Sequence, residues 1–216
     1  MQKNQQLFRS KKIATRINKY LNSWLEEKDR LIIGIEGYSA SGKTAVADCL
    51  AEENSAVVVI HLDDLLKSSE ERATMMNSGE DRSEVFELKW YRYDLLDDII
   101  EKFKQEIRYS IDIYDYDLKK MVSKEYNLSK TILVIEGIFL FHPKHKISKM
   151  FDKKIYLDID LKKADDRRIR REKKRWGKKY VDEKHPNSFL KYFKEAYQRY
   201  SDNYHPKKLA DLVVVV

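Results

Sequence analysis

One eight-residue segment constrains this chain more than any other. Residues 37–44 read Gly-Tyr-Ser-Ala-Ser-Gly-Lys-Thr and match the pattern G-x-x-x-x-G-K-[S/T]. An apolar run at 31–36 precedes the segment and a helix-forming stretch at 44–53 follows it, which is the context this pattern requires. Glycines allow successive backbone N–H groups to point inward, and the helix N-terminus adds its positive dipole end. This segment, called the phosphate loop below, therefore predicts a nucleotide-binding α/β protein.

The side chains of the phosphate loop suit a polyphosphate and its metal. Lys43 can reach the outer phosphates, and the Thr44 hydroxyl can bind Mg²⁺. We expect the nucleotide to be held by Gly37, Ser39, Ala40, Ser41, Gly42, Lys43, Thr44 and Ala45.

Five apolar runs rich in Val, Ile and Leu predict five buried strands, at residues 31–36, 55–62, 131–137, 153–160 and 211–216. Helical patterns lie at 8–25, 44–53, 86–108 and 162–204, and the polar residues 67–84 predict a loop. Continuously apolar strands that alternate with helices indicate a parallel five-stranded sheet with helices on both faces. No linker is evident, so we expect one domain at 31–216 with an N-terminal helix (1–30) packed on it; a membrane-surface helix is the alternative.

The positive charge of the chain is concentrated in one segment. The net charge is +7, and residues 162–179 alone carry 11 basic and 3 acidic residues, a net charge of +8. A local cluster suits a triphosphate, whereas nucleic acid requires a broader track, so we expect a small-molecule partner and no nucleic-acid partner. The apolar runs are too short to cross a bilayer, and the single cysteine, Cys49, fits a reducing compartment. We therefore expect no membrane partner and a cytoplasmic location; whether the chain forms a homo-oligomer is left open.

Acidic residues follow two of the predicted strands. Asp63 and Asp64 come after the run at 55–62, and Glu136 ends the run at 131–137. Because the carboxyl ends of parallel strands meet at one edge of a sheet, we expect Asp63 and Glu136 to converge on the phosphate loop. A carboxylate there can accept the proton of an attacking hydroxyl or bind Mg²⁺. The alternative for Asp63 and Asp64 is the capping of a helix.

Two other classes of phosphate-loop protein lack their signatures here. A GTPase should carry an Asn-Lys-x-Asp base reader late in the chain, but the only Asn-Lys pair, at residues 18–19, precedes the phosphate loop. Motor and transporter ATPases usually have Asp-Glu after the corresponding strand, whereas residues 134–137 read Val-Ile-Glu-Gly. A kinase is the interpretation that these comparisons favour.

Several segments together resemble the uridine kinase-like P-loop kinases, which include relatives of phosphoribulokinase and pantothenate kinase. The phosphate loop is similar to their G-x-S-A-S-G-K-[S/T] loop, residues 61–66 to their Asp-[Asp/Ser]-Phe-Tyr segment, 135–138 to their Glu-Gly-Ile element and 167–171 to their Arg-x-x-Arg-Arg lid. The resemblance covers residues 31–216. It implies a P-loop NTPase fold with an arginine-rich lid at about residues 162–185, and ATP and Mg²⁺ as cofactors.

The resemblance also implies roles for single residues. Asp63 matches the catalytic base, and Glu136 matches a glutamate near the metal and phosphates, so Thr44, Glu136 and Asp63 are the candidate metal ligands. Arg167 and Arg171 are i, i+4 neighbours whose guanidinium groups can bind phosphate oxygens, with a solvated charge as the alternative for each. Together with Asp63 and Lys43, these two arginines are the candidate catalytic residues.

The acceptor side is less well defined by the sequence. Residues 114–116 (Tyr-Asp-Tyr) resemble the Tyr-Asp-Phe that lines the nucleoside pocket, but Lys119 stands where the nucleoside kinases carry a histidine, and residues 65–66 are leucines where aromatics are usual. We expect acceptor contacts from Asp64, Glu87, Tyr114 and Lys119, with a surface carboxylate as the alternative for Glu87. Trp90 and Tyr93 fit a helical stripe and are expected in the core.

The sequence as a whole predicts transfer of the ATP γ-phosphate to a hydroxyl of a nucleoside (uridine- or cytidine-like). Kinases of a pantothenate-like compound or a sugar phosphate are alternatives within the same class. A nucleotide-binding regulator or a nucleic-acid-binding ATPase without kinase activity is the alternative from a different class.

Overall fold

A five-stranded parallel sheet forms the centre of the computed structural model, which describes residues 2–105, 107–115, 120–185 and 188–216. The order of the strands is β2-β5-β1-β6-β7, and every neighbouring pair is parallel. The strands are β1 (Leu31–Gly37), β2 (Val57–His61), β5 (Ile132–Gly137), β6 (Lys153–Asp158) and β7 (Leu212–Val215). Each strand coincides with one of the predicted apolar runs, so the predicted parallel sheet is confirmed.

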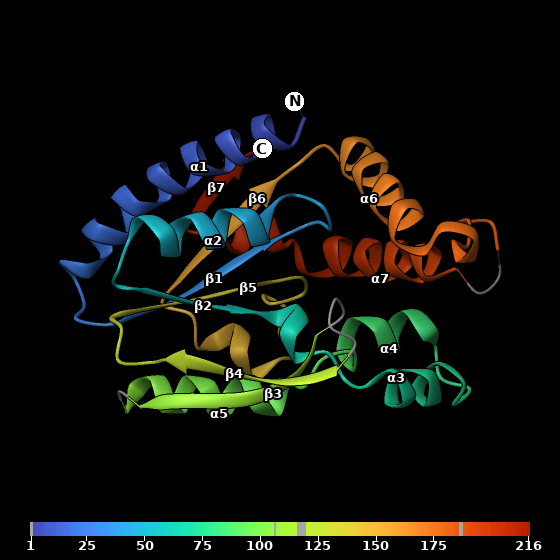
Figure 1. Ribbon diagram of the computed structural model, residues 1–216, viewed down its shortest axis with the longest axis horizontal. Helices are drawn as coiled ribbons and strands as arrows, with labels where there is room; N and C mark the ends of the chain where they lie inside the picture. Colours follow the sequence, from blue (N-terminus) through green and yellow to red (C-terminus); the bar gives the residue numbers. More distant parts are fainter. Residues whose placement is uncertain (1, 106, 116–119, 186–187) are drawn as a thin grey trace.

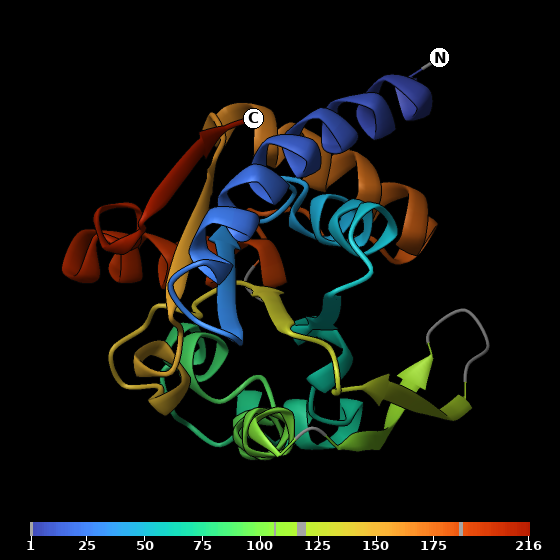
Figure 2. The same ribbon diagram turned by 90° about the vertical axis from the view of Figure 1, so that its left-hand side faces the viewer.

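Helices cover both faces of the sheet (Figures 1 and 2). On one face, α1 (Gln2–Leu25) and α2 (Lys43–Glu53) pack in an apolar cluster that includes Ile33 and Ile35 of β1. On the other face, the cluster that includes Ile32 contains residues of α4, α5 and α7. Successive β1 side chains thus enter opposite layers, as the two-residue period of a strand requires. This arrangement explains why β1 is buried along its whole length.

The segment between β2 and the hairpin is more helical than its composition predicts. It contains α3 (Ser69–Met76), α4 (Arg82–Leu88) and α5 (Tyr93–Lys104), so the predictions of a loop at 67–84 and of one helix over 86–108 are wrong. Ser68 forms a capping box with Glu71, which starts α3 within a polar segment. The backbone then leaves the helical conformation between α4 and α5, where Leu66 and Tyr91 form an isolated β-bridge.

An antiparallel hairpin, β3 (Arg108–Asp115) and β4 (Lys120–Asn127), stands apart from the main sheet (Figure 2). Most of its side chains are exposed or half-buried, and only Ile111, Ile113 and Tyr126 are buried. This weak apolar alternation explains why the hairpin is not evident in the sequence.

The charged region at 162–204 forms two helices instead of one. These are α6 (Leu161–Trp176) and α7 (Phe189–Tyr204), and α6 ends at Gly177, whose φ of 50° is left-handed. Short 3₁₀ segments are η1 (Leu62–Leu65), η2 (Lys146–Lys149), η3 (Gly177–Lys179) and η4 (Pro206–Leu209). No helix in the described part of the chain has both the length and the apolarity that a bilayer crossing demands.

Candidate active site

The phosphate loop connects β1 to α2, and its two glycines follow from the path of the backbone. Gly42, at the N-cap of α2, has a φ of 98°, a left-handed conformation that glycine adopts without steric cost. Gly37 has no space for a side chain, because a Cβ there would lie 2.5 Å from the carbonyl oxygen of Leu157. The buried Lys43 ammonium donates hydrogen bonds to the carbonyl oxygens of Gly37 (2.9 Å) and Tyr38 (3.1 Å).

The other predicted nucleotide-binding residues occupy the same turn. Ala40 has a φ of 61°, and the backbone N–H of Ser41 donates to the carbonyl oxygen of Tyr38 at 3.2 Å. The buried Ser41 hydroxyl has no hydrogen-bond partner among the described residues. Ser39 and Ala45 are half-buried on either side of this turn. A tight loop with an unused buried hydroxyl at a helix N-terminus fits a phosphate group.

A chain of polar contacts crosses the carboxyl ends of the strands beside this loop. The Thr44 hydroxyl donates to Glu136 Oε1 at 3.0 Å, and His61 Nδ1 lies 2.9 Å from the same oxygen. His61 Nε2 lies 3.2 Å from Asp48 Oδ1 of α2. Burial lowers the pKa of His61, but the bonds to Asp48 and Glu136 outweigh it and raise that pKa to about 9. The sequence analysis identified Thr44 and Glu136 but missed the imidazole that bridges Glu136 to α2.

Asp63 lies directly after β2, in η1, and accepts a hydrogen bond from the buried Tyr91 hydroxyl at 3.2 Å. Desolvation by the surrounding protein and the negative charge of Glu136 raise the pKa of Asp63, whereas Lys43 and Tyr91 lower it. Its carboxylate therefore shares one electrostatic environment with Lys43 and Glu136, although it comes from a different strand.

The polar groups at this edge suit Mg²⁺ better than a metal that needs a protein cage. Thr44 and Glu136 supply a hydroxyl and a carboxylate whose oxygens are 3.0 Å apart. Asp63 adds a second carboxylate, whose pKa is raised by the charge of Glu136. Among the residues that the structure describes, no three His, Cys, Asp or Glu side chains gather as metal ligands. Mg²⁺ commonly takes one or two protein oxygens and completes its shell with phosphate oxygens and water.

Asp64 faces the hairpin. It accepts hydrogen bonds from Lys124 Nζ at 2.6 Å and from the Tyr126 hydroxyl at 3.1 Å, both on β4. The predicted acceptor-binding residue thus ties η1 to the hairpin, and it is one side of an ion pair instead of a lone carboxylate. The partner strand was not evident in the sequence, which is why this role was not foreseen.

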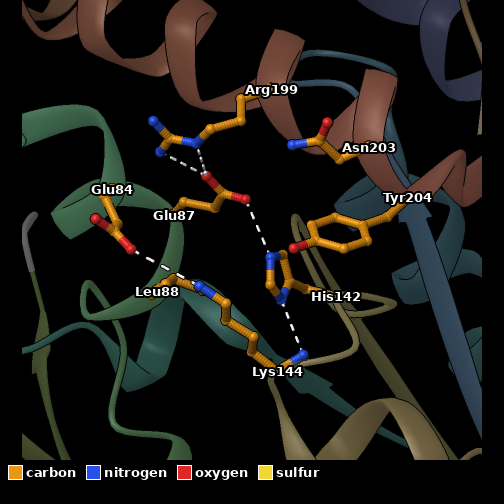
Figure 3. Close-up of a pocket in the computed structure, with 8 residues that line it drawn as sticks. All are labelled: Glu84, Glu87, Leu88, His142, Lys144, Arg199, Asn203 and Tyr204. Carbon is orange, nitrogen blue, oxygen red and sulfur yellow. Dashed lines mark hydrogen bonds and ion pairs between the residues drawn. The ribbon is translucent and has the colours of Figure 1, made fainter.

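Glu87 lies inside the protein, so the alternative of a surface carboxylate is wrong. Its Oε1 lies 3.0 Å from His142 Nε2, and its Oε2 lies 2.6 Å from Arg199 of α7 (Figure 3). His142 Nδ1 accepts the backbone N–H of Lys144 at 3.1 Å, which leaves Nε2 as the donor to Glu87. Burial by itself raises the pKa of Glu87. The bonds from His142 and Arg199 outweigh this effect, so the pKa lies below its ordinary value. Both oxygens are engaged, so an acceptor contact by Glu87 stays a prediction that requires these bonds to open.

The pocket beside Glu87 has a volume of about 220 Å³ and lies between α4, α7 and the segment after β5 (Figure 3). Its lining residues are Glu84, Glu87, Leu88, His142, Lys144, Arg199, Asn203 and Tyr204. None of them belongs to the phosphate loop or to the carboxylate cluster at the strand ends. Of the predicted site residues that the structure describes, only Glu87 lines this pocket.

The arginines of α6 divide between the loop and the core. Arg167 approaches the carbonyl oxygen of Ala40 at 3.5 Å, and the charge of Arg171 lowers the pKa of both Lys43 and Asp63. Arg168 is instead buried, with its guanidinium 3.8 Å from the ring centre of Phe193 on α7. These positions support Arg167 and Arg171 as the two lid candidates.

Tyr38, an unspecified position of the motif, joins the phosphate loop to α6 and α7. Its hydroxyl donates to Asp165 of α6 at 2.8 Å, and its ring lies 5.1 Å from Phe193 and 4.5 Å from Tyr197 of α7. Asp165 also pairs with Lys194 of α7 at 2.9 Å. The motif pattern does not specify this residue, so sequence reasoning missed it.

Of the remaining acceptor candidates, Tyr114 is exposed on β3, whereas Lys119 lies outside the described residues, as does Tyr116. Trp90 is buried and stacks on Phe86, as expected for a core residue, whereas Tyr93 is half-buried beside the core.

Comparison with known proteins finds related sequences over most of the chain. Residues 32–216 match the model of the phosphoribulokinase / uridine kinase family. The chain is 29% identical over 196 residues to uridine-cytidine kinase-like 1 of Mus musculus, covering 88% of this chain and 34% of that protein. It is 26% identical over 185 residues to the uridine kinase of Borrelia duttonii, covering 85% of both. The chain thus spans about a third of the length of the mouse relative and most of the bacterial one.

Two solved structures share the fold of this chain. A structure described as a possible uridine kinase from Bacillus stearothermophilus has a TM-score of 0.66 and 23% identity, covering 94% of this chain and 98% of that chain. Phosphoribulokinase from Rhodobacter spheroides has a TM-score of 0.64 and 13% identity, covering 87% of this chain and 70% of that chain. At these identities the likeness establishes the α/β fold.

Proposed function

We propose, since the chain belongs to the phosphoribulokinase / uridine kinase family, that it is a kinase transferring the γ-phosphate of ATP to a hydroxyl of a small molecule, with a nucleoside as the leading acceptor. The observation that carries the proposal is the convergence of Lys43, Glu136 and Asp63, whose charges act on one another beside the phosphate loop. Phosphoryl transfer depends mainly on positioning and charge stabilisation, and these three side chains supply both.

Asp63 is the residue we assign to the acceptor hydroxyl. Its raised pKa makes the carboxylate a better proton acceptor, and the Tyr91 hydroxyl holds it in place. A general base poised in this way orients the acceptor and takes its proton as the new P–O bond forms. Lys43 binds the phosphates, and Arg167 and Arg171 neutralise charge that develops on the transferred group.

Thr44 and Glu136 are the residues that would hold Mg²⁺, with Asp63 nearby. Mg²⁺ held by these residues would supply positive charge that offsets the negative charge of the phosphates. His61 keeps the Glu136 carboxylate directed at Thr44, because it binds the oxygen that also accepts the threonine hydroxyl. The protein contributes this fixed set of oxygens before nucleotide binds.

The proposal of a nucleoside acceptor draws on the relatives, since the mouse and Borrelia proteins are named as uridine or uridine-cytidine kinases. Pantothenate-like compounds and sugar phosphates are the alternative acceptors. Tyr114 and the hairpin would flank an acceptor bound at Asp63, because Asp64 ties the hairpin to η1.

The proposal is tested by ATP consumption with Mg²⁺ against a panel of nucleosides, pantothenate and sugar phosphates. Asp63→Asn is assayed in parallel, with Asp202→Asn, an exposed change on α7, as the matched control. We expect one acceptor to stimulate turnover, Asp63→Asn to lower that turnover on the order of 10²- to 10⁴-fold, and ATP binding to persist in the variant. The control should keep full turnover.

Two results would count against the proposal. If no acceptor stimulates turnover although ATP binds, the chain acts as a nucleotide-binding module, and titration with RNA and DNA at several salt concentrations follows. If an acceptor works but Asp63→Asn retains full turnover, the kinase stands and the role of Asp63 is wrong.

A further inference from the structure

Glu36 is a fully buried carboxylate immediately before the phosphate loop, and neither the motif nor the proposed reaction uses it. It is the residue of β1 directly before Gly37, and it has no solvent-exposed surface. Its Oε2 accepts the backbone N–H of Phe141 at 2.7 Å and the Tyr200 hydroxyl at 2.8 Å. Its Oε1 has no hydrogen-bond partner among the described residues. A buried carboxylate with an unsatisfied oxygen is costly when it is charged.

The groups around Glu36 compensate its charge only in part. Two lysines act on it, Lys43 from the phosphate loop and Lys154 from β6. The other titratable groups that interact with it are tyrosines from three elements, namely Tyr93 of α5, Tyr156 of β6, and Tyr197 and Tyr200 of α7. Desolvation is the largest effect and raises the pKa of Glu36 to about 7, although the two hydrogen bonds and both lysines lower it.

Glu36 is therefore coupled to the residue that binds phosphate. The Glu36 charge raises the pKa of Lys43, and the Lys43 charge lowers the pKa of Glu36. A polyphosphate next to Lys43 adds negative charge and cancels part of the attraction that keeps Glu36 ionised. The weaker attraction favours the neutral form of the buried Glu36 carboxyl group.

We propose that Glu36 is a proton-linked positioning residue, which takes up one proton from solvent when a nucleoside triphosphate binds to the phosphate loop. An O–H bond forms at Oε1, the oxygen without a partner, and no other covalent bond changes; release of the nucleotide returns the proton to solvent. The inference rests on the proposed function, since it requires the phosphate loop to bind nucleotide.

The proton changes how tightly α7 is held to the loop. Hydrogen bonds to a charged carboxylate are stronger than those to a neutral acid, so protonation weakens the bonds from Tyr200 and from Phe141 N–H. The same helix packs Phe193 and Tyr197 against Tyr38 of the phosphate loop. Nucleotide affinity and the attachment of α7 are then linked reciprocally through one proton.

The test is calorimetric titration of the full chain with ATP at pH 7.5, without acceptor and with a chelator, in two buffers of different ionisation enthalpy. The buffer dependence of the heat gives the protons taken up per nucleotide. We expect wild type to take up about half a proton more than Glu36→Gln, because Glu36 is mostly ionised at this pH before ATP binds. Glu52→Gln, an exposed change on α2, should match wild type.

Equal proton uptake in wild type and Glu36→Gln, with ATP bound in both, would overturn this inference and leave the proposed function intact. Absence of ATP binding to wild type would overturn both. Kinase turnover that fails while linked proton uptake persists would overturn the proposed function alone.

A second measurement does not require nucleotide. The pKa of Glu36 in the folded chain, about 7, lies above its ordinary value of 4.5, so its contribution to stability is complete below 4.5 and lost as the pH rises through 7. The melting temperature of wild type should therefore fall relative to Glu36→Gln between pH 5 and pH 8; parallel profiles would contradict the idea. If Glu36→Gln does not fold, Tyr200→Phe removes one donor to the carboxylate and should move this loss to higher pH, whereas an unmoved profile sinks the inference.

Discussion

Single side chains around the phosphate loop draw their properties from partners that are distant in the chain. His61 lies 75 positions before Glu136 and contacts it at 2.9 Å, and Asp63 is held by Tyr91, 28 positions away. The first contact exists because parallel strands bring their carboxyl ends to one edge. The second exists because the isolated bridge between Leu66 and Tyr91 holds the segment between α4 and α5 against the residues after β2. The candidate catalytic and metal-binding residues could be identified in the sequence, but the contacts that set their pKa values and orientation could not.

His61 leads to a prediction on pH-dependent stability. Its pKa is about 9 in the folded chain and 6.5 ordinarily, so its contribution to stability is complete below 6.5 and lost as the pH rises through 9. Comparing wild type with His61→Gln by urea denaturation in chelator, we expect a difference of at most about 3 kcal/mol near pH 6 that shrinks by pH 9.5.

Asp48→Asn serves as the graded control, because it removes one of the two carboxylates that face the imidazole. It should reduce the pH-dependent difference without abolishing it. A stability gap between wild type and His61→Gln that is constant from pH 6 to pH 9.5 would mean that His61 acts through packing alone.

At the scale of elements, α6 combines two tasks. Arg168 anchors it on Phe193, while Arg167 and Arg171 direct charge toward the phosphate loop. Asp165 accepts a hydrogen bond from Tyr38, which connects the helix that carries the lid arginines to the phosphate loop. The basic segment in the sequence indicated a lid, but its composition could not separate the anchoring arginine from the others.

The lid assignment predicts a loss of turnover without a loss of stability. Arg167→Ala with Arg171→Ala should lower turnover on the order of 10²-fold, because two positive charges near the transferred phosphate are removed. Arg170→Ala with Lys174→Ala removes the same charge from the same helix at exposed i, i+4 positions and should leave turnover unchanged. Both double variants should unfold at the wild-type urea concentration; equal turnover in the two would refute the lid assignment.

At the scale of the whole molecule, the two faces of the sheet are covered by different kinds of side-chain contact. Helices α1 and α2 pack on one face in a cluster of apolar side chains. The other face carries α4 and α7, where the buried Glu87 pairs with the half-buried Arg199 and the buried Tyr200 hydroxyl donates to Glu36. Stability on the first face therefore depends on apolar burial, and the second face couples packing to charge.

The packing of α1 predicts that this helix unfolds together with the domain. Ile17 is fully buried in the cluster with α2, so Ile17→Ala should cost about 2–5 kcal/mol of unfolding free energy. Tyr20→Ala, on the exposed side of the same helix, should cost less than about 1 kcal/mol. The measurement is urea denaturation followed by circular dichroism and tryptophan fluorescence; an unchanged midpoint for Ile17→Ala would show that α1 detaches before the domain unfolds.

The sequence by itself determined the features that depend on residues adjacent in the chain. The phosphate loop, the five apolar runs and the alternation of strands with helices are local patterns, and they were sufficient for the parallel sheet and for the position of Lys43 and Thr44. Local patterns failed where the signal was weak, as in the half-exposed hairpin, or where a long-range bridge lies between two helices that were predicted as one, at residues 89–92.

Only the tertiary structure decided which polar groups meet. The contact of Asp64 with Lys124 depends on the hairpin, and the surface alternative for Glu87 is wrong because α7 brings Arg199 to its side. Glu36 looked like one more residue of an apolar strand. Its burial and the bonds to its Oε2 depend on Phe141 and Tyr200, which lie 105 and 164 positions away, while its Oε1 has no partner among the described residues. The energy of a buried charge depends on its full three-dimensional surroundings, so a one-dimensional pattern cannot determine it.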